Sequence, residues 1–177
     1  MEKLLSAKHW QIFILLLVGL IIGSLKIEND ATLTSILTIV GIIIYAIYPL
    51  ALGHFLQEYL PKKVELNHNL FLINVFLWIT VYSIVTIISD GEGMTFDGLL
   101  ALPIFYVFFA IIHSFTFPAR TLKTVEIGRK AGFGEYVGEF FLILFLPLGI
   151  WFLQPRINKI INENHPISDN PKTENLN

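Results

Sequence analysis

The chain has 177 residues, of which 54% are hydrophobic and 15% are charged, and its formal net charge is -2. Soluble domains usually carry about a quarter charged residues, so most of this chain is expected to lie in lipid. The slightly acidic balance excludes the basic surface of a nucleic-acid-binding protein. The absence of cysteine excludes disulfides, thiolate metal sites, a cysteine nucleophile and a lipoprotein anchor.

Four segments are apolar over most of the length that a spanning helix needs, which is about 20 residues for roughly 30 Å of hydrocarbon. None of them contains Asp, Glu, Lys or Arg, and none shows the alternation of barrel strands, so helices are the remaining choice. We predict an all-α membrane bundle with four firm transmembrane helices. They are residues 10–25, 33–52, 70–89 and 99–117.

The loops predict the orientation of the bundle. Lys and Arg precede the first helix, lie between the second and third, and follow the fourth, whereas the opposite loops hold only Lys26. Cytoplasmic loops are enriched in Lys and Arg, so the N-terminus is expected in the cytoplasm.

A fifth apolar segment, residues 137–153, allows two interpretations. It is barely long enough to span, and Pro147 and Gly149 interrupt it. A straight span would place Arg156 and Lys159 outside, against the charge rule, whereas a re-entrant segment would keep them inside. Charge favours re-entry and length permits a span.

The end of the chain has a different composition from the rest. Residues 162–177 are rich in Asn, Pro, Glu and Ser and lack apolar periodicity, so this tail is expected to be disordered. Residues 1–161 are expected to form a single bundle, because the hydrophobic segments follow one another with short connections.

Polar side chains within membrane segments are candidates for function because they are costly in hydrocarbon. The predicted orientation places five such residues near the cytoplasmic leaflet, and Arg156 joins them if the fifth segment is re-entrant. They form either a polar pocket or interhelical hydrogen bonds of about 0.6 to 2 kcal/mol each. An ion pair between Glu139 and Arg156 requires a re-entrant fifth segment, because a straight helix would separate the two residues by roughly 25 Å. The six are His54, Asn74, His113, Ser114, Glu139 and Arg156.

Two further features concern packing and the membrane surface. Gly19 and Gly23 form a GxxxG pair, which favours close helix contact within the chain over a dimer face. The stretch 119–135 is either a surface helix that binds anionic lipid headgroups or an ordinary topogenic loop. Its basic residues are Arg120, Lys123, Arg129 and Lys130.

Catalytic signatures are absent from the sequence. It contains no His-Glu-x-x-His zinc helix, no Gly-x-Ser-x-Gly elbow and no pair of carboxylates within the membrane. His54 and Glu58 share a helical face but lack a third metal ligand. We therefore expect no catalytic residue, no metal and no cofactor.

The stretch EFFLILFLPLGIWFLQPRIN at 139–158, with ARTLK at 119–123 ahead of it, resembles the C-terminal part of small uncharacterised bacterial multi-pass membrane proteins. The resemblance implies a bacterial cytoplasmic membrane and brings no activity with it.

Three functions remain open. The leading hypothesis is a non-enzymatic accessory or scaffold subunit whose partners are the lipid bilayer, including anionic lipids, and another membrane protein. The alternative is a small transporter or channel with its site at Asn74, His113 and Glu139. The third is a membrane enzyme acting on lipid.

Overall fold

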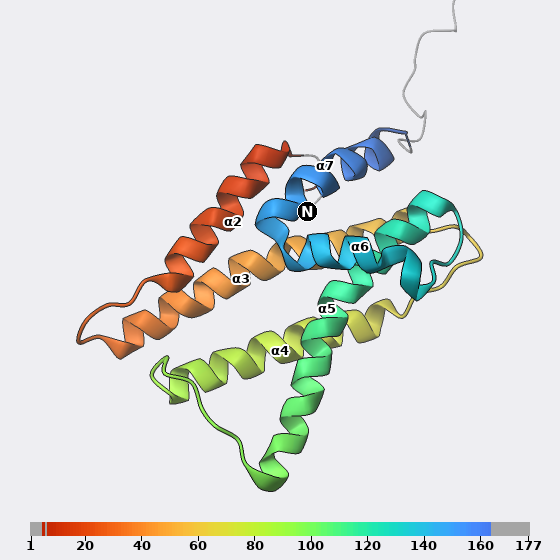
Figure 1. Ribbon diagram of the computed structural model, residues 1–177. Coiled ribbons are helices and arrows are strands. Elements are labelled where there is room, and N and C mark those ends of the chain that lie inside the picture. The colour runs from red at the N-terminus through yellow and green to blue at the C-terminus, as the bar shows by residue number, and fades with distance from the viewer. Residues whose placement is uncertain (1–4, 6, 164–177) are drawn as a thin grey trace, which may run out of the picture.

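The computed structural model describes Leu5 and residues 7–163, and these form helices with no strand among them. The prediction of an all-α fold is confirmed for this part of the chain. Figure 1 shows the arrangement of the helices. They are α2 (His9–Ser24), α3 (Ala31–Phe55), α4 (His68–Ile88), α5 (Ala101–Ile127), α6 (Phe133–Leu144) and α7 (Leu146–Glu163), with 3-10 turns η1 (Leu56–Tyr59) and η2 (Gly98–Leu100).

Three helical segments are long and apolar enough to cross a membrane, namely Ala31–Tyr59, His68–Ile88 and Ala101–Ile127. They correspond to the second, third and fourth predicted spans. The first predicted span, 10–25, forms α2, which has 16 residues and is shorter than the other three. A count of four spans is therefore not shown by length and composition.

Asparagine and aspartate caps explain why α3 and α4 begin earlier than hydropathy predicts. The side chain of Asp30 accepts a hydrogen bond from the backbone amide of Leu33 at 2.8 Å, and that of Asn67 accepts one from the amide of Leu70 at 3.1 Å. Each cap satisfies an amide that the first turn of a helix leaves without a partner. The helices thus start just after these two residues.

The helix of the fourth predicted span is longer than the sequence indicated. It was expected to stop at Phe117, before Pro118, but α5 continues to Ile127. Pro118 lacks an amide hydrogen, yet it is buried with Ala119 and Leu122 on the same stretch of helix, and this packing outweighs the cost of the proline. The first half of the predicted basic loop is therefore the end of α5, which is buried at several positions as far as Thr124.

The fifth apolar segment does not form one straight helix. The helical backbone is interrupted at Phe145, and α6 and α7 form the two arms of a hairpin, as Figure 1 shows. Pro147 lies in the first turn of α7, where its missing amide hydrogen costs nothing. A side chain at Gly149 would overlap the carbonyl oxygen of Leu142, so the tight turn requires glycine there.

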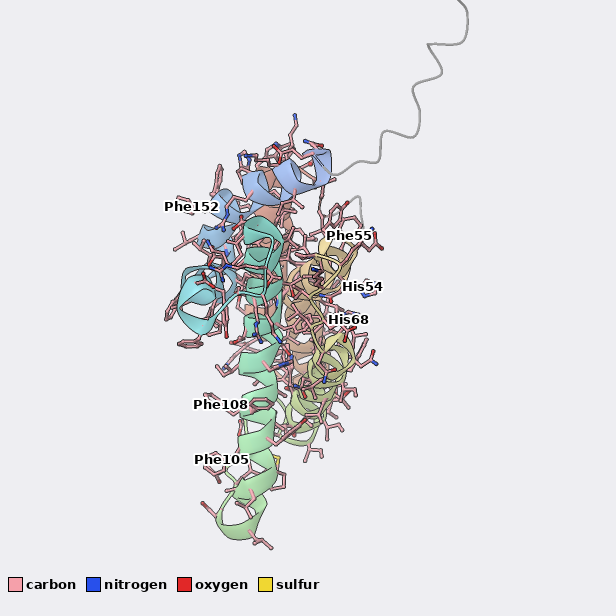
Figure 2. All side chains as sticks on the ribbon, turned by 90° about the vertical axis from the view of Figure 1, so that its right-hand side faces the viewer. His54, Phe55, His68, Phe105, Phe108 and Phe152 are labelled. Atoms are coloured by element: carbon pink, nitrogen blue, oxygen red, sulfur yellow. The ribbon has the colours of Figure 1, made fainter. Side chains whose placement is uncertain are left out.

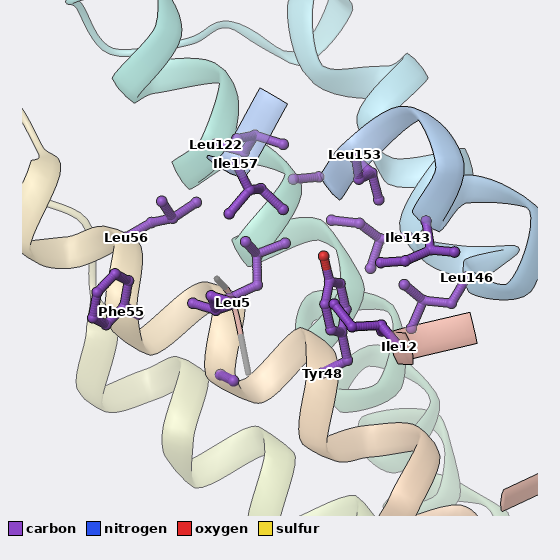
Figure 3. Close-up of a cluster of buried hydrophobic side chains, with 14 of the residues drawn as sticks. Leu5, Ile12, Tyr48, Phe55, Leu56, Leu122, Ile143, Leu146, Leu153 and Ile157 are labelled. Carbon is purple, nitrogen blue, oxygen red and sulfur yellow. The ribbon is translucent and has the colours of Figure 1, made fainter. Parts of the chain in front are cut away.

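The largest hydrophobic core lies where α2, α3, α5, α6 and α7 meet (Figure 3). Its fully buried members include Tyr48, Leu52, Leu122, Ile143 and Leu153. We call this the packed end of the bundle; α3, α5 and α7 finish there, and α2 begins there. The opposite end, where α3 and α5 begin, we call the open end.

The predicted disordered tail, 162–177, lies outside the described residues except for Asn162 and Glu163. These two residues belong to α7.

Candidate functional site

Four charged side chains form an ion-pair cluster at the packed end: Lys123 and Glu126 of α5, Glu139 of α6 and Arg156 of α7. The Nη2 atom of Arg156 lies 2.6 Å from a carboxylate oxygen of Glu139 and 2.5 Å from one of Glu126. The Nε atom of Arg156 donates to the second oxygen of Glu126 at 2.6 Å. The Nζ atom of Lys123 lies 3.4 Å from Glu139 and 3.8 Å from Glu126.

The hairpin makes this cluster possible, because it returns Arg156 to the level of Glu139. A straight fifth helix would have kept the two residues roughly 25 Å apart. Two cations and two carboxylates balance, and each has a partner of opposite charge. The cluster therefore holds the hairpin against α5 by ion pairs. Its charges compensate one another, so none is left to bind a charged ligand.

The charges shift the ionisation of both central residues, which lie outside the three candidate spans. Hydrogen bonding to Glu126, and then to Glu139, raises the pKa of Arg156 above its ordinary value. Burial by itself raises the pKa of Glu139, but the hydrogen bond from Arg156 and the nearby positive charges outweigh it. Its pKa lies below the ordinary value of 4.5. Glu139 is thus held as a carboxylate.

A second polar group joins α4 and α5 within the candidate spans. Asn74 is fully buried, and its Nδ2 atom lies 3.1 Å from Nδ1 of His113. The hydroxyl of Tyr106 donates to the Oδ1 atom of Asn74 at 3.1 Å. The structure thus places Asn74 and His113 side by side and adds Tyr106, which sequence reasoning missed.

The remaining two candidates have other partners. His54 lies against His68, with Nδ1 of the first 3.0 Å from Nε2 of the second, and both side chains are labelled in Figure 2. The hydroxyl of Ser114 donates to the carbonyl of Ala110 in its own helix at 2.7 Å. The six residues therefore do not form one pocket; in the described part of the chain, no hydrogen bond or ion pair connects the ion-pair cluster to the Asn74 group.

A buried hydrogen-bond junction that the sequence did not reveal lies in the core. The hydroxyl of Tyr48 donates to the side-chain oxygen of Gln154 at 2.8 Å, across 106 positions of sequence. The amide nitrogen of Gln154 donates to the carbonyls of Leu5 and Ala7. Gln154 thereby ties α3, α7 and the N-terminal segment together. The only sequence signal was its place before Pro155 and Arg156.

The four basic residues of 119–135 divide between the interior and the surface. Arg120 donates to the carbonyl of Ala131 at 3.2 Å and Lys123 belongs to the ion-pair cluster. Arg129 is exposed and pairs with Glu135 at 2.6 Å, and Lys130 is exposed as well. Arg120 and Lys123 therefore bond to other parts of the same chain. The prediction of a membrane-surface loop did not include such internal contacts.

The glycine pair of α2 is used within the chain, as its sequence context favoured. A side chain at Gly41 of α3 would overlap backbone atoms of both Gly19 and Gly23. The absence of side chains at all three positions lets the backbones of α2 and α3 touch.

No group of three His, Asp or Glu side chains that could hold a metal ion occurs in Leu5 and residues 7–163. No family of proteins, curated protein or solved structure was found to match the chain. The resemblance of residues 139–158 to small bacterial membrane proteins therefore stays a prediction.

Proposed function

We propose that the protein is a small multi-pass membrane protein that acts as a non-enzymatic accessory or scaffold subunit, and that a membrane-protein partner packs against the open-end half of α5. The observation that carries this proposal is the contrast in burial along one helix. Residues 101–109 include no buried residue, whereas nine residues between Ala110 and Thr124 are buried.

The unpacked half of α5 is rich in aromatic side chains. Phe105 is 71% exposed and Phe108 is 63% exposed, and Figure 2 shows both on the part of the helix that lies away from the packed end. Aromatic residues are enriched at the centres of protein interfaces. Lipid alone could cover these rings, so the rings by themselves do not distinguish a partner from the bilayer.

The polar group beside these rings supports a protein partner over lipid. Tyr106 is 45% exposed, although its hydroxyl belongs to the hydrogen-bonded group with Asn74 and His113. Polar groups facing hydrocarbon are costly, and helix interfaces in membranes are where they are normally covered. A partner helix on this side of α5 would bury Tyr106 together with Phe105 and Phe109.

The membrane placement follows from the two ends of the bundle. In this proposal α3, α4 and α5 cross the membrane, α2 is a fourth, short crossing, and the hairpin enters and leaves on one side. The described N-terminal residues and the end of α7 lie at the packed end (Figure 1). Most Lys and Arg residues belong to this end, so we assign it to the cytoplasm of a bacterium, with the inner membrane as the site of the protein.

Site-specific photo-cross-linking in intact cells tests the proposal. A benzoylphenylalanine at position 105 or 108 is expected to form a discrete adduct with one protein that also co-purifies in mild detergent. The same group in place of Phe152, which is 65% exposed at the packed end, is the matched control. Phe105→Ala combined with Phe108→Ala should abolish the co-purification.

Two results would count against the proposal. One is a monodisperse monomer in mild detergent with no protein adduct from position 105 or 108. The other is an equal adduct from position 152. The sidedness is tested separately by a C-terminal reporter after Asn177, which is expected to be active only in the cytoplasm.

A further inference from the structure

A groove of about 580 Å³ lies between α2, α3, α4 and the tip of the hairpin. Its walls include Leu20 of α2, Ile42 and Tyr45 of α3, Tyr82 of α4 and Leu148 beside the hairpin turn. Its lining is almost entirely apolar, and none of the six polar candidates described above belongs to it. Its size lies in the range of small-molecule sites in proteins.

A second cavity, of about 440 Å³, is polar and lies at the open end. It is formed by the loop between α2 and α3 and the start of the loop after α4. It contains one cation, Lys26, and three carboxylates, those of Asp30, Asp90 and Glu92. Asp30 caps α3, but the described residues offer no ion pair to Lys26, Asp90 or Glu92.

The two cavities follow one another along a single face of α3. Thr34 belongs to the polar cavity, and Thr38, Ile42 and Tyr45 belong to the groove. Their spacing of four, four and three residues keeps them on one side of a helix. The apolar groove therefore lies beyond the polar cavity on the same face of α3, toward the middle of the bundle.

We call the polar cavity and the groove together the track along α3. The length of this track is close to the thickness of one leaflet of a bilayer. From Thr34 to Tyr45 the helix rises about 17 Å, of which the groove from Thr38 to Tyr45 takes about 10 Å, and half of the hydrocarbon core is about 15 Å. The groove ends at the hairpin, where the hydroxyl of Tyr45 donates to the carbonyl of Leu144 at 2.9 Å. The larger part of one acyl chain fits this depth, whereas water in such an apolar groove would lack hydrogen-bond partners.

We propose that this track binds one zwitterionic phospholipid of the phosphatidylethanolamine type. One acyl chain lies in the groove, the phosphate lies at Lys26, and the ammonium lies at Asp90 and Glu92. An anionic lipid would find only one cation among three carboxylates, so the charges favour a headgroup that carries both signs. The inference goes beyond the subunit role and depends only on insertion of the bundle in a membrane.

The test measures which lipids stay on the full-length protein. The protein is reconstituted in nanodiscs of equal amounts of phosphatidylethanolamine and phosphatidylglycerol with identical chains, extracted in mild detergent, and weighed by native mass spectrometry. The expected result is one retained phospholipid per chain, with phosphatidylethanolamine preferred by about fivefold, which is about 1 kcal/mol. A preference for phosphatidylglycerol, or retention of no lipid, would overturn the proposal.

Two variants, each with a tryptophan on α2, distinguish lipid bound in the groove from lipid bound elsewhere on the surface. Leu20→Trp places a bulky ring in the groove at a half-exposed position, so the fold should survive. Leu17→Trp places the same ring on the same helix outside the groove and is the matched control. The first is expected to lower lipid retention about tenfold and the second to leave it unchanged. Equal retention in both variants would remove the groove as the site.

The headgroup assignment has its own variant. Asp90→Asn combined with Glu92→Gln removes the two carboxylates proposed for the ammonium. The preference for phosphatidylethanolamine should fall to about equality with phosphatidylglycerol while the retained amount persists. An unchanged preference would contradict the headgroup assignment. Neither outcome affects the cross-linking result at Phe105, which tests the protein partner independently.

Discussion

The two halves of α5 have opposite surroundings, and the more apolar half is the less buried one. None of residues 101–109 is buried, whereas the buried residues from Ala110 onward pack against side chains of α3, α4 and the hairpin of α6 and α7. Hydropathy does not distinguish a side chain that faces lipid from one that faces another helix, because both environments are apolar. The difference therefore identifies where the chain completes its own packing and where it leaves a surface for another molecule.

The charged residues show the same division between the two ends. At the packed end, Lys123, Glu126, Glu139 and Arg156 neutralise one another in contact. At the open end, Lys26 and Glu92 are exposed beside a cavity without an ion pair in the described part of the chain. Paired charges hold the fold together, while the unpaired ones are available to a headgroup.

The largest effect is expected from a pair of identical substitutions in the two halves of α5. Phe115 is 7% exposed, and Phe115→Ala leaves a cavity in the core, so the free energy of unfolding should fall by about 3 kcal/mol. Phe105→Ala removes an exposed ring and should change it by less than about 0.5 kcal/mol. Unfolding of the isolated protein in detergent measures both. Similar losses would show that the open half is packed after all.

The contact between α2 and α3 is expected to be the next most sensitive. Gly41→Leu forces atoms into the backbone of Gly19 and Gly23 and should lower the free energy of unfolding by about 2 to 3 kcal/mol. Gly138→Ala is the control, because a Cβ there meets nothing within 4 Å, and it should be neutral or stabilising. If Gly41→Leu were as stable as the control, α2 would not be held against α3 by these glycines.

The ion-pair cluster is tested by Arg156→Met. The variant leaves two carboxylates close together with only Lys123 to compensate them, and the buried one is Glu139. We expect a loss of about 2 kcal/mol in the free energy of unfolding, because the site is partly exposed to solvent. Lys130→Met removes an exposed cation of the same region and should change it by less than about 0.5 kcal/mol. An equally small change for Arg156→Met would show that the hairpin is held by the apolar core alone.

Acid should weaken the packed end by a smaller amount. The folded state lowers the pKa of Glu139 below 4.5, so this carboxylate contributes stability that is fully present above 4.5 and lost as the pH falls through its folded pKa. The charges that face it are Arg156 and Lys123, and Glu126 shares both of them. The apparent unfolding temperature in detergent should fall over that acid range.

Glu139→Gln is the control for this pH dependence, because it cannot titrate. The fall in unfolding temperature should be smaller in this variant than in the original protein. Identical pH profiles would assign the acid sensitivity to other carboxylates.

The sequence alone determined that the chain is helical and suited to a membrane, and it gave the approximate positions of α3, α4 and α5. Apolar segment length follows from the thickness of the bilayer and needs no knowledge of neighbours, which is why α3, α4 and α5 were predicted. The sequence also indicated the helix break near Pro147 and the close approach of two helices at Gly19 and Gly23, because proline and glycine act on the local backbone.

Only the tertiary structure decided which residues meet. The pairing of Tyr48 with Gln154, the role of Glu126, the separation of the polar candidates into groups and the continuation of α5 past Pro118 all depend on how helices rotate and cross. Helix rotation is set by packing across the whole bundle, and a single sequence does not display it. For the same reason the unpacked half of α5 could not be told from the packed half until the helices were placed in space.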